Sequence, residues 1–122
     1  MKTILIVEDS ATERHAMKAA LEKAGYAVLE AVDGESGVQL AKDKAPDLIL
    51  MDIVMPGMTG FQATRAITRE AATSHIPVVM VTTKAQQTDQ LWGERQGASA
   101  YLTKPLDTSE LLATIKAQLE QA

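Results

Sequence analysis

The residues best suited to chemistry follow four short apolar runs of the sequence. They are the acidic pair Glu8 and Asp9, the single acid Asp52, the hydroxyl pair Thr82 and Thr83, and Lys104. Three carboxylates that point into one crevice repel one another, so without a cation at least one would have a raised pKa. All-oxygen coordination suits Mg²⁺, which binds few protein carboxylates and keeps several waters. A metal ion, a lysine and a hydroxyl around a carboxylate can stabilise a transferring phosphoryl group, and Asp can accept one covalently.

The apolar runs that precede these residues alternate with longer amphipathic stretches. The runs are Ile4–Val7, Ala27–Ala31, Leu48–Met51, Val78–Val81 and Ala100–Leu102. Three of them are almost entirely apolar, which indicates parallel strands covered on both faces, whereas the second and fifth are weaker and are expected at sheet edges. Helical spacing of apolar residues predicts helices around 16–24, 38–41, 61–67, 86–96 and 111–119, the last of them capped by Asp107 or Thr108.

This order of elements predicts a (βα)5 fold of the α/β class, in which a five-stranded parallel sheet carries helices on both faces. In such doubly wound sheets the ligand crevice lies outside the carboxyl ends of the strands, where the strand order reverses. The polar residues that follow the strands should therefore meet at one edge of the sheet. This convergence depends on the strand order, which the alternation of elements does not determine.

The composition fits one compact domain. The chain has 122 residues, of which 46% are hydrophobic and only 3% aromatic, so we expect a single aliphatic domain over 1–122 with no output domain. Its 12 Lys and Arg against 16 Asp and Glu give a net charge of −4, which argues against binding of nucleic acid or of an anionic membrane surface. Cysteine is absent and the first apolar run is too short for a signal peptide, so we expect a cytoplasmic protein without membrane insertion.

Four segments of the chain carry a resemblance to a known family. They are Ile4–Ser10, Leu50–Gly60, Ile76–Lys84 and Gly97–Pro105. In these segments and in their order, the chain resembles the CheY-like response-regulator receiver domains over nearly its whole length. The resemblance implies the strand order 2-1-3-4-5 and a two-component phosphorelay function, in which a histidine kinase or its phosphotransfer domain donates a phosphoryl group.

The resemblance also assigns the acidic residues to a metal-dependent phosphorylation site. Asp52 would be the phosphoacceptor, and Mg²⁺ or Mn²⁺ would be bound by Asp9, by Asp52 and by the backbone carbonyl of Val54. Glu8, which stands where the family more often has Asp, would reach the metal through a water. A purely structural alternative for this region is helix capping by Asp9 or Ser10, which is compatible with metal binding.

Two further residues would contact the phosphoryl group. Lys104 would pair with its oxygens, and a cis peptide bond before Pro105 would aim the lysine. Either hydroxyl of the threonine pair could donate to the phosphoryl group on chemical grounds, and the resemblance selects Thr82, with Thr83 lining the access. The structural alternatives are a surface lysine before a turn proline and a β-branched residue that ends a strand.

A partner-binding face is implied on the fourth helix, the fifth strand and the fifth helix, where a downstream protein target would dock. Tyr101 would move inward when Thr82 is pulled towards the phosphoryl group; the alternative is an edge-strand aromatic packed on the last helix. Trp92, the only tryptophan, is interpreted as part of the partner face because Trp is enriched at interface hot spots, with a core position as the alternative. Thr83 and Pro105 would belong to the same switch region.

Within the family the chain most resembles the PilH-like single-domain regulators of type IV pilus twitching motility, in the segments Met51–Gly57, Gly60–Arg65 and Leu91–Ala98. This implies chemotaxis-like control of twitching by a protein that assists only its own phosphorylation and dephosphorylation. Three alternatives remain: a phosphate sink for a shared kinase, a binding module that has lost phosphorylation, and a metal-dependent aspartyl-phosphate phosphohydrolase. Val54 argues against the phosphohydrolase, because such enzymes often place an acid two residues after the nucleophile.

Overall fold

The computed structural model describes residues 1–83 and 93–121, which form a parallel sheet with helices on both faces. The strands are β1 (Thr3–Val7), β2 (Ala27–Ala31), β3 (Leu48–Asp52), β4 (Val78–Thr82) and β5 (Ala100–Thr103). The helices are α1 (Ala11–Lys23), α2 (Gly34–Lys44), α3 (Gly60–Arg69) and α5 (Thr108–Glu120). Residues 93–95 are helical too, and the remainder of the helix predicted over 86–96 lies outside the described residues.

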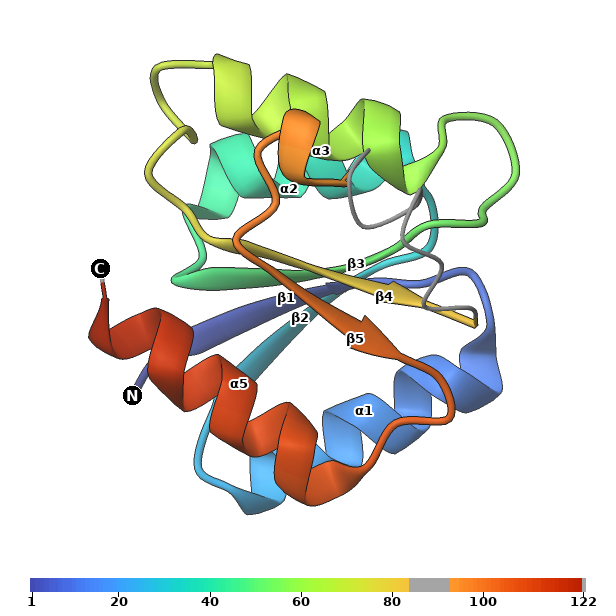
Figure 1. Cartoon of the computed structure of the whole chain (residues 1–122), viewed down its shortest axis with the longest axis vertical. Helices are drawn as coiled ribbons and strands as arrows, with labels where there is room; N and C mark the ends of the chain where they lie inside the picture. The colour runs from blue at the N-terminus through green and yellow to red at the C-terminus, as the bar shows by residue number, and fades with distance from the viewer. Residues whose placement is uncertain (84–92, 122) are drawn as a thin grey trace.

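The strands lie in the order β2-β1-β3-β4-β5 and all pair in parallel (Figure 1). The α/β prediction, the strand order implied by the resemblance and the edge positions of β2 and β5 are therefore confirmed. Every residue of β3 and β4 is buried, whereas β2 and β5 are mostly half-buried. The continuous apolar runs thus mark central strands that helices cover on both sides.

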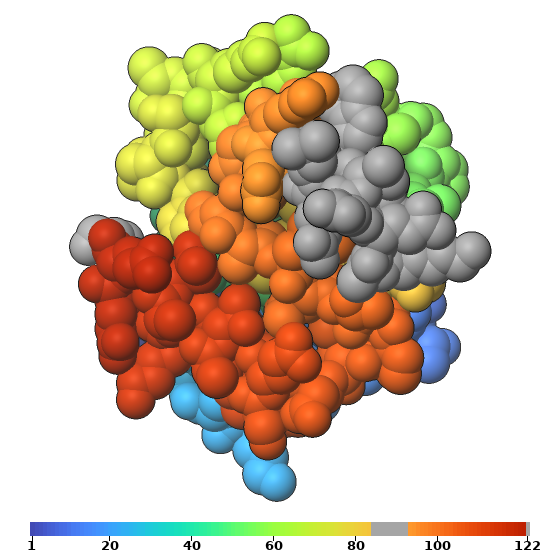
Figure 2. Space-filling model, viewed as in Figure 1, coloured from blue at the N-terminus to red at the C-terminus, as the bar shows by residue number. Residues whose placement is uncertain are grey.

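Successive side chains of each strand point to opposite faces, so the sheet has two apolar layers. Leu5 and Val7 pack with α2 and α3 on one face, and Ile4 and Ile6 pack with α1 and α5 on the other. Figure 1 shows these two pairs of helices above and below the sheet. In the space-filling view, α5 (red) and residues 93–107 (orange) occupy one continuous face (Figure 2).

Side-chain caps define where the helices begin. The hydroxyl of Ser10 accepts from the backbone N–H of Glu13, so Ser10 rather than Asp9 is the N-cap of α1. Asp107 caps α5 in the same way. Because Ser10 caps the helix, the carboxylate of the preceding Asp9 can serve another purpose. None of the helices within the described ranges is long and apolar enough to cross a lipid bilayer.

Gly60 brings the start of α3 against the end of β3. Its N–H donates to the carbonyl of Ile53 at 2.9 Å. A Cβ added at this position would lie 2.1 Å from the carbonyl oxygen of Asp52 and 2.8 Å from Cα of Ile53. Only glycine therefore permits the approach that closes the loop after Asp52.

We expect Gly60→Ala to lower the free energy of unfolding by about 3 kcal/mol, because the new methyl group meets backbone rather than a flexible side chain. Urea denaturation measures the change. Gly25→Ala is the matched control: Gly25 has a φ of 96° with open space around it, so backbone strain alone should cost about 1 kcal/mol. Equal losses in the two variants would show that the close approach at Gly60 is not a packing constraint.

Candidate functional site

The chemically suited residues meet at the carboxyl edge of the sheet, as the sequence predicts. Glu8 and Asp9 follow β1, Asp52 and Thr82 end β3 and β4, and Lys104 follows β5. They line a pocket of about 260 Å³, together with Glu13, Val54 and Thr83. Among the described residues around this pocket, four carry a carboxylate and one an ammonium group.

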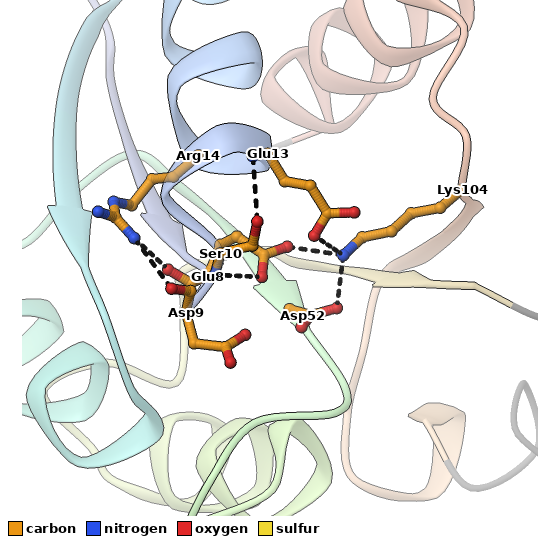
Figure 3. Close-up of polar contacts among 7 residues, drawn as sticks. All are labelled: Glu8, Asp9, Ser10, Glu13, Arg14, Asp52 and Lys104. Carbon is orange, nitrogen blue, oxygen red and sulfur yellow. Dashed lines mark hydrogen bonds and ion pairs between the residues drawn. The ribbon is translucent and has the colours of Figure 1, made fainter.

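Lys104 binds acidic side chains that come from different parts of the chain (Figure 3). Its Nζ lies 2.7 Å from Oε1 of Glu8, 2.8 Å from Oε2 of Glu13 and 3.1 Å from Oδ1 of Asp52. The backbone N–H of Lys104 donates to the carbonyl of Thr82 at 2.5 Å, which anchors the lysine at the end of β4. The peptide bond between Lys104 and Pro105 is cis, as the resemblance implies.

Two residues that organise this site, Glu13 and Arg14, were not predicted from the sequence. Glu13 lies in the first turn of α1 and pairs with Lys104. Arg14 donates from Nη1 to the backbone carbonyls of Glu8 (2.9 Å) and Asp9 (3.4 Å), and its Nε pairs with Glu30 at 3.3 Å. The position of Glu13, an acidic residue in the first turn after the capping Ser10, was the one available signal in the sequence. The sequence did not show which face of the helix Glu13 lies on, so its pairing with Lys104 could not be predicted.

The three predicted metal-binding acids lie close enough to share one cation. One carboxylate oxygen from each of Glu8, Asp9 and Asp52 can be chosen so that all lie within 4.8 Å of one another. Glu8 and Asp52 are only 1% and 6% exposed, whereas Asp9 is open to solvent. Figure 3 shows Asp9 on the side of Glu8 and Asp52 that is opposite Lys104. This donor set of hard oxygen atoms fits a divalent ion such as Mg²⁺, which would flank Asp52 from the side away from the lysine.

Burial alters the protonation of the inner carboxyls. Burial raises the pKa of Glu8 to about 7, although hydrogen bonds from Lys104 and from the backbone of Ser10 oppose the shift. Burial also raises the pKa of Asp52, against the opposing charge of Lys104. Burial would lower the pKa of Lys104, but the carboxylates of Glu13, Glu8 and Asp52 together raise it above its ordinary value. The pocket thus has an excess of negative charge that one lysine does not neutralise.

The remaining predicted residues differ in burial and in the elements that they contact. Thr82 is 4% exposed, and Thr83 is exposed at the rim of the pocket. Tyr101 packs against the apolar layer of α2 and α3, with its ring beside Gly93, so the alternative in which it packs on the last helix is wrong. The reason is the alternation of β5, whose neighbouring Leu102 faces α5 instead. Trp92 lies outside the described residues.

The chain is similar to a known protein family and to individual regulatory proteins. The response regulator receiver domain family matches residues 4–116. The chain is 59% identical over 119 residues to Protein PilH of Pseudomonas aeruginosa, covering 98% of each chain. It is 41% identical to the phosphate regulon transcriptional regulatory protein PhoB of the same species, across 98% of this chain and 52% of the relative. The chain thus spans about half the length of this second relative.

Solved structures show the same fold. The chemotaxis protein CheY4 of Vibrio cholerae is similar with a TM-score of 0.91 and 32% identity, covering 96% of this chain and 98% of the other. A receiver domain of a sensor histidine kinase from Pseudomonas aeruginosa has a TM-score of 0.91 and 31% identity, covering 98% of both chains. That structure holds a magnesium ion coordinated in its active-site cleft.

Without divalent cations, we expect the free energy of unfolding to fall as the pH rises from about 4.5 to about 7. Folding raises the pKa of Glu8 from 4.5 to about 7, so the folded state holds the proton more tightly than the unfolded chain. The stabilisation is therefore complete below pH 4.5 and lost as the pH rises through 7, by at most about 3 kcal/mol. Asp52, whose pKa is also raised, acts in the same direction.

Urea denaturation at a series of pH values in EDTA measures this profile. Glu8→Gln, which is neutral throughout, should flatten the slope across the same window. Asp33, whose pKa is lowered by hydrogen bonds from Ser36, acts only below its ordinary value of 3.8 and does not interfere. A wild-type profile that is flat or rises with pH would show that Glu8 is not forced towards its neutral form.

Proposed function

The chain belongs to the response-regulator receiver family, and from this we propose that Asp52 accepts a phosphoryl group from a histidine kinase or its phosphotransfer domain. The observation that carries the proposal is the environment of Asp52. The Nζ of Lys104 lies 3.1 Å from its Oδ1, and the carboxylates of Glu8 and Asp9 lie beside it. An aspartate that served only as a loop cap would not need a lysine from the far end of the chain.

In the proposed reaction, an oxygen of Asp52 attacks the phosphorus atom of phosphohistidine. The P–N bond breaks as the P–O bond forms, and the electron pair leaves with the imidazole, which takes up a proton. Lys104 and the hydroxyl of Thr82 bind the oxygens of the transferring group, on which negative charge is concentrated. Water later hydrolyses the mixed anhydride, so the protein assists its own phosphorylation and dephosphorylation and is not proposed to turn over other substrates.

A divalent ion is the expected cofactor of this site. We propose that Mg²⁺, or Mn²⁺ in its place, is held by Asp9, Asp52 and the backbone carbonyl of Val54, with Glu8 reaching it through a water. The bound ion would neutralise charge on the phosphoryl oxygens. The apolar side chain of Val54, 75% exposed, lines the pocket where a phosphohydrolase would need an acid.

Phosphorylation must also change what the protein binds. Moving a switch from 1:99 to 99:1 requires about 5.5 kcal/mol, and one charge-assisted hydrogen bond supplies about 1.5–3 kcal/mol. Lys104 alone is insufficient, so we propose that Thr82 moves towards the phosphoryl group and that Tyr101 repacks behind it. The output surface would then include Thr83, Tyr101, Pro105 and Trp92, on the face formed by the fourth helix, β5 and α5.

The biological setting is proposed from the PilH-like character of the chain. We propose chemotaxis-like control of type IV pilus twitching motility by a cytoplasmic protein. Support comes from identity to PilH that extends over almost the full length of both chains, whereas PhoB matches over only part of its own.

Incubation with Mg²⁺ and acetyl phosphate should add one alkali-labile phosphoryl group, detected by intact mass. Asp52→Asn should abolish the adduct, because the amide is a poor nucleophile, and EDTA should abolish it in the wild type. Asp43→Asn, which removes the same charge from an exposed position on α2, is the matched control and should behave as wild type. An adduct that persists in Asp52→Asn would refute the assignment of the phosphoacceptor.

In the organism that encodes the protein, a chromosomal Asp52→Asn allele should alter the diameter of twitching zones as a deletion does. The reason is that the proposed signal depends on phosphorylation and not on the presence of the folded domain alone. The Asp43→Asn allele should leave twitching unchanged. A normal twitching zone in the deletion strain would remove the motility role and leave the phosphorylation chemistry intact.

A further inference from the structure

The ammonium group of Lys104 has no hydrogen left to donate. A lysine carries three N–H donors, and in this structure Glu8, Glu13 and Asp52 accept at 2.7, 2.8 and 3.1 Å. In the proposed phosphorylation, Lys104 must donate to a phosphoryl oxygen as well. One of the carboxylates must then release the ammonium, and the environment of each decides which one does so at the least cost.

Glu13 is the partner that can leave most cheaply. The side chain of Glu8 is 1% exposed and that of Asp52 is 8% exposed, so a carboxylate released from Lys104 at either position would stay in a buried site, out of reach of bulk water. The side chain of Glu13 is 44% exposed, so water can solvate its carboxylate after release. In the proposed reaction Asp52 also carries the phosphoryl group itself, so it cannot leave the site.

The surroundings of Glu13 allow its side chain to move by itself. The hydroxyl of Ser10 accepts from the backbone N–H of Glu13 at 3.3 Å, which holds the first turn of α1 in place. Glu13 and Lys104 also line a second pocket of about 220 Å³ between α1 and the start of α5. The released carboxylate therefore has space beside the site and needs no change of the backbone.

We propose that Glu13 is a positioning residue, which holds Lys104 in the unphosphorylated protein and releases it when the phosphoryl group arrives. This inference rests on the proposed phosphorylation of Asp52. It assigns to Glu13 a brake on phosphorylation, because its carboxylate competes with the phosphoryl oxygens for the same ammonium and repels them. No covalent bond changes at Glu13; one ion pair of Lys104 is exchanged for another.

Glu13→Gln should speed the uptake of phosphoryl from acetyl phosphate in Mg²⁺ about two- to fivefold, which is the effect expected of a half-exposed ion pair. The same variant should bind beryllofluoride, a phosphoryl mimic, more tightly by a similar factor. Both differences should shrink as salt is added, because the pair is open to screening. Glu22→Gln removes the same charge from an exposed position near the other end of α1 and should match wild type.

A spectroscopic measurement separates release of Lys104 from a merely structural role of Glu13. In protein labelled with ¹³C at the glutamate carboxyls, addition of Mg²⁺ and beryllofluoride should move the Glu13 signal towards that of exposed Glu22, whose own signal stays constant. A Glu13 signal that does not move, or a Glu13→Gln variant no faster than wild type, overturns the inference while the wild type still takes up phosphoryl. If wild type takes up none, the proposed function itself fails, and the inference fails with it.

Discussion

The ammonium group of Lys104 is the interaction on which the rest of the site depends. It binds Glu8 after β1, Asp52 at the end of β3 and Glu13 on α1, so a residue from the last part of the chain joins elements from the first half. Two of these carboxylates are almost fully buried. Buried carboxylates that lie so close together repel one another, which is unfavourable unless a cation lies among them. The lysine therefore makes the acidic edge of the sheet compatible with a folded protein.

One lysine balances only part of the charge, and this deficit is what the proposed function uses. Burial raises the pKa of both Glu8 and Asp52, so it disfavours the ionised form of both carboxyls. A divalent ion on the side of Asp9 would relieve the excess from the direction that Lys104 does not cover. With such an ion bound, Asp52 would have a cation in addition to Lys104 beside it, and both would stabilise a transferring phosphoryl group.

Much of this architecture could be predicted from the residues in order. The apolar runs located the five strands to within one residue at each end. The three central strands were the clearest, because strands covered on both faces must be almost continuously apolar. The polar residues after those runs identified the edge of the sheet that carries the site. The strand order itself came from family resemblance, and it decides that Val7, Asp52 and Thr82 end neighbouring strands.

The sequence alone determined which residue types lie at the ends of the strands. Hydrophobic periodicity and the rule for parallel sheets can be applied without knowing which residues far apart in the chain are in contact. Only the tertiary structure decided which side chains bind one another. Glu13 and Arg14 follow one another in α1, yet one binds Lys104 and the other binds the carbonyl of Glu8, because the helical rotation turns them to different neighbours. Tyr101 likewise faces α3 and not α5, because successive side chains of β5 alternate between the two faces of the sheet. The residues of β5 do not reveal by themselves which of them faces which helix.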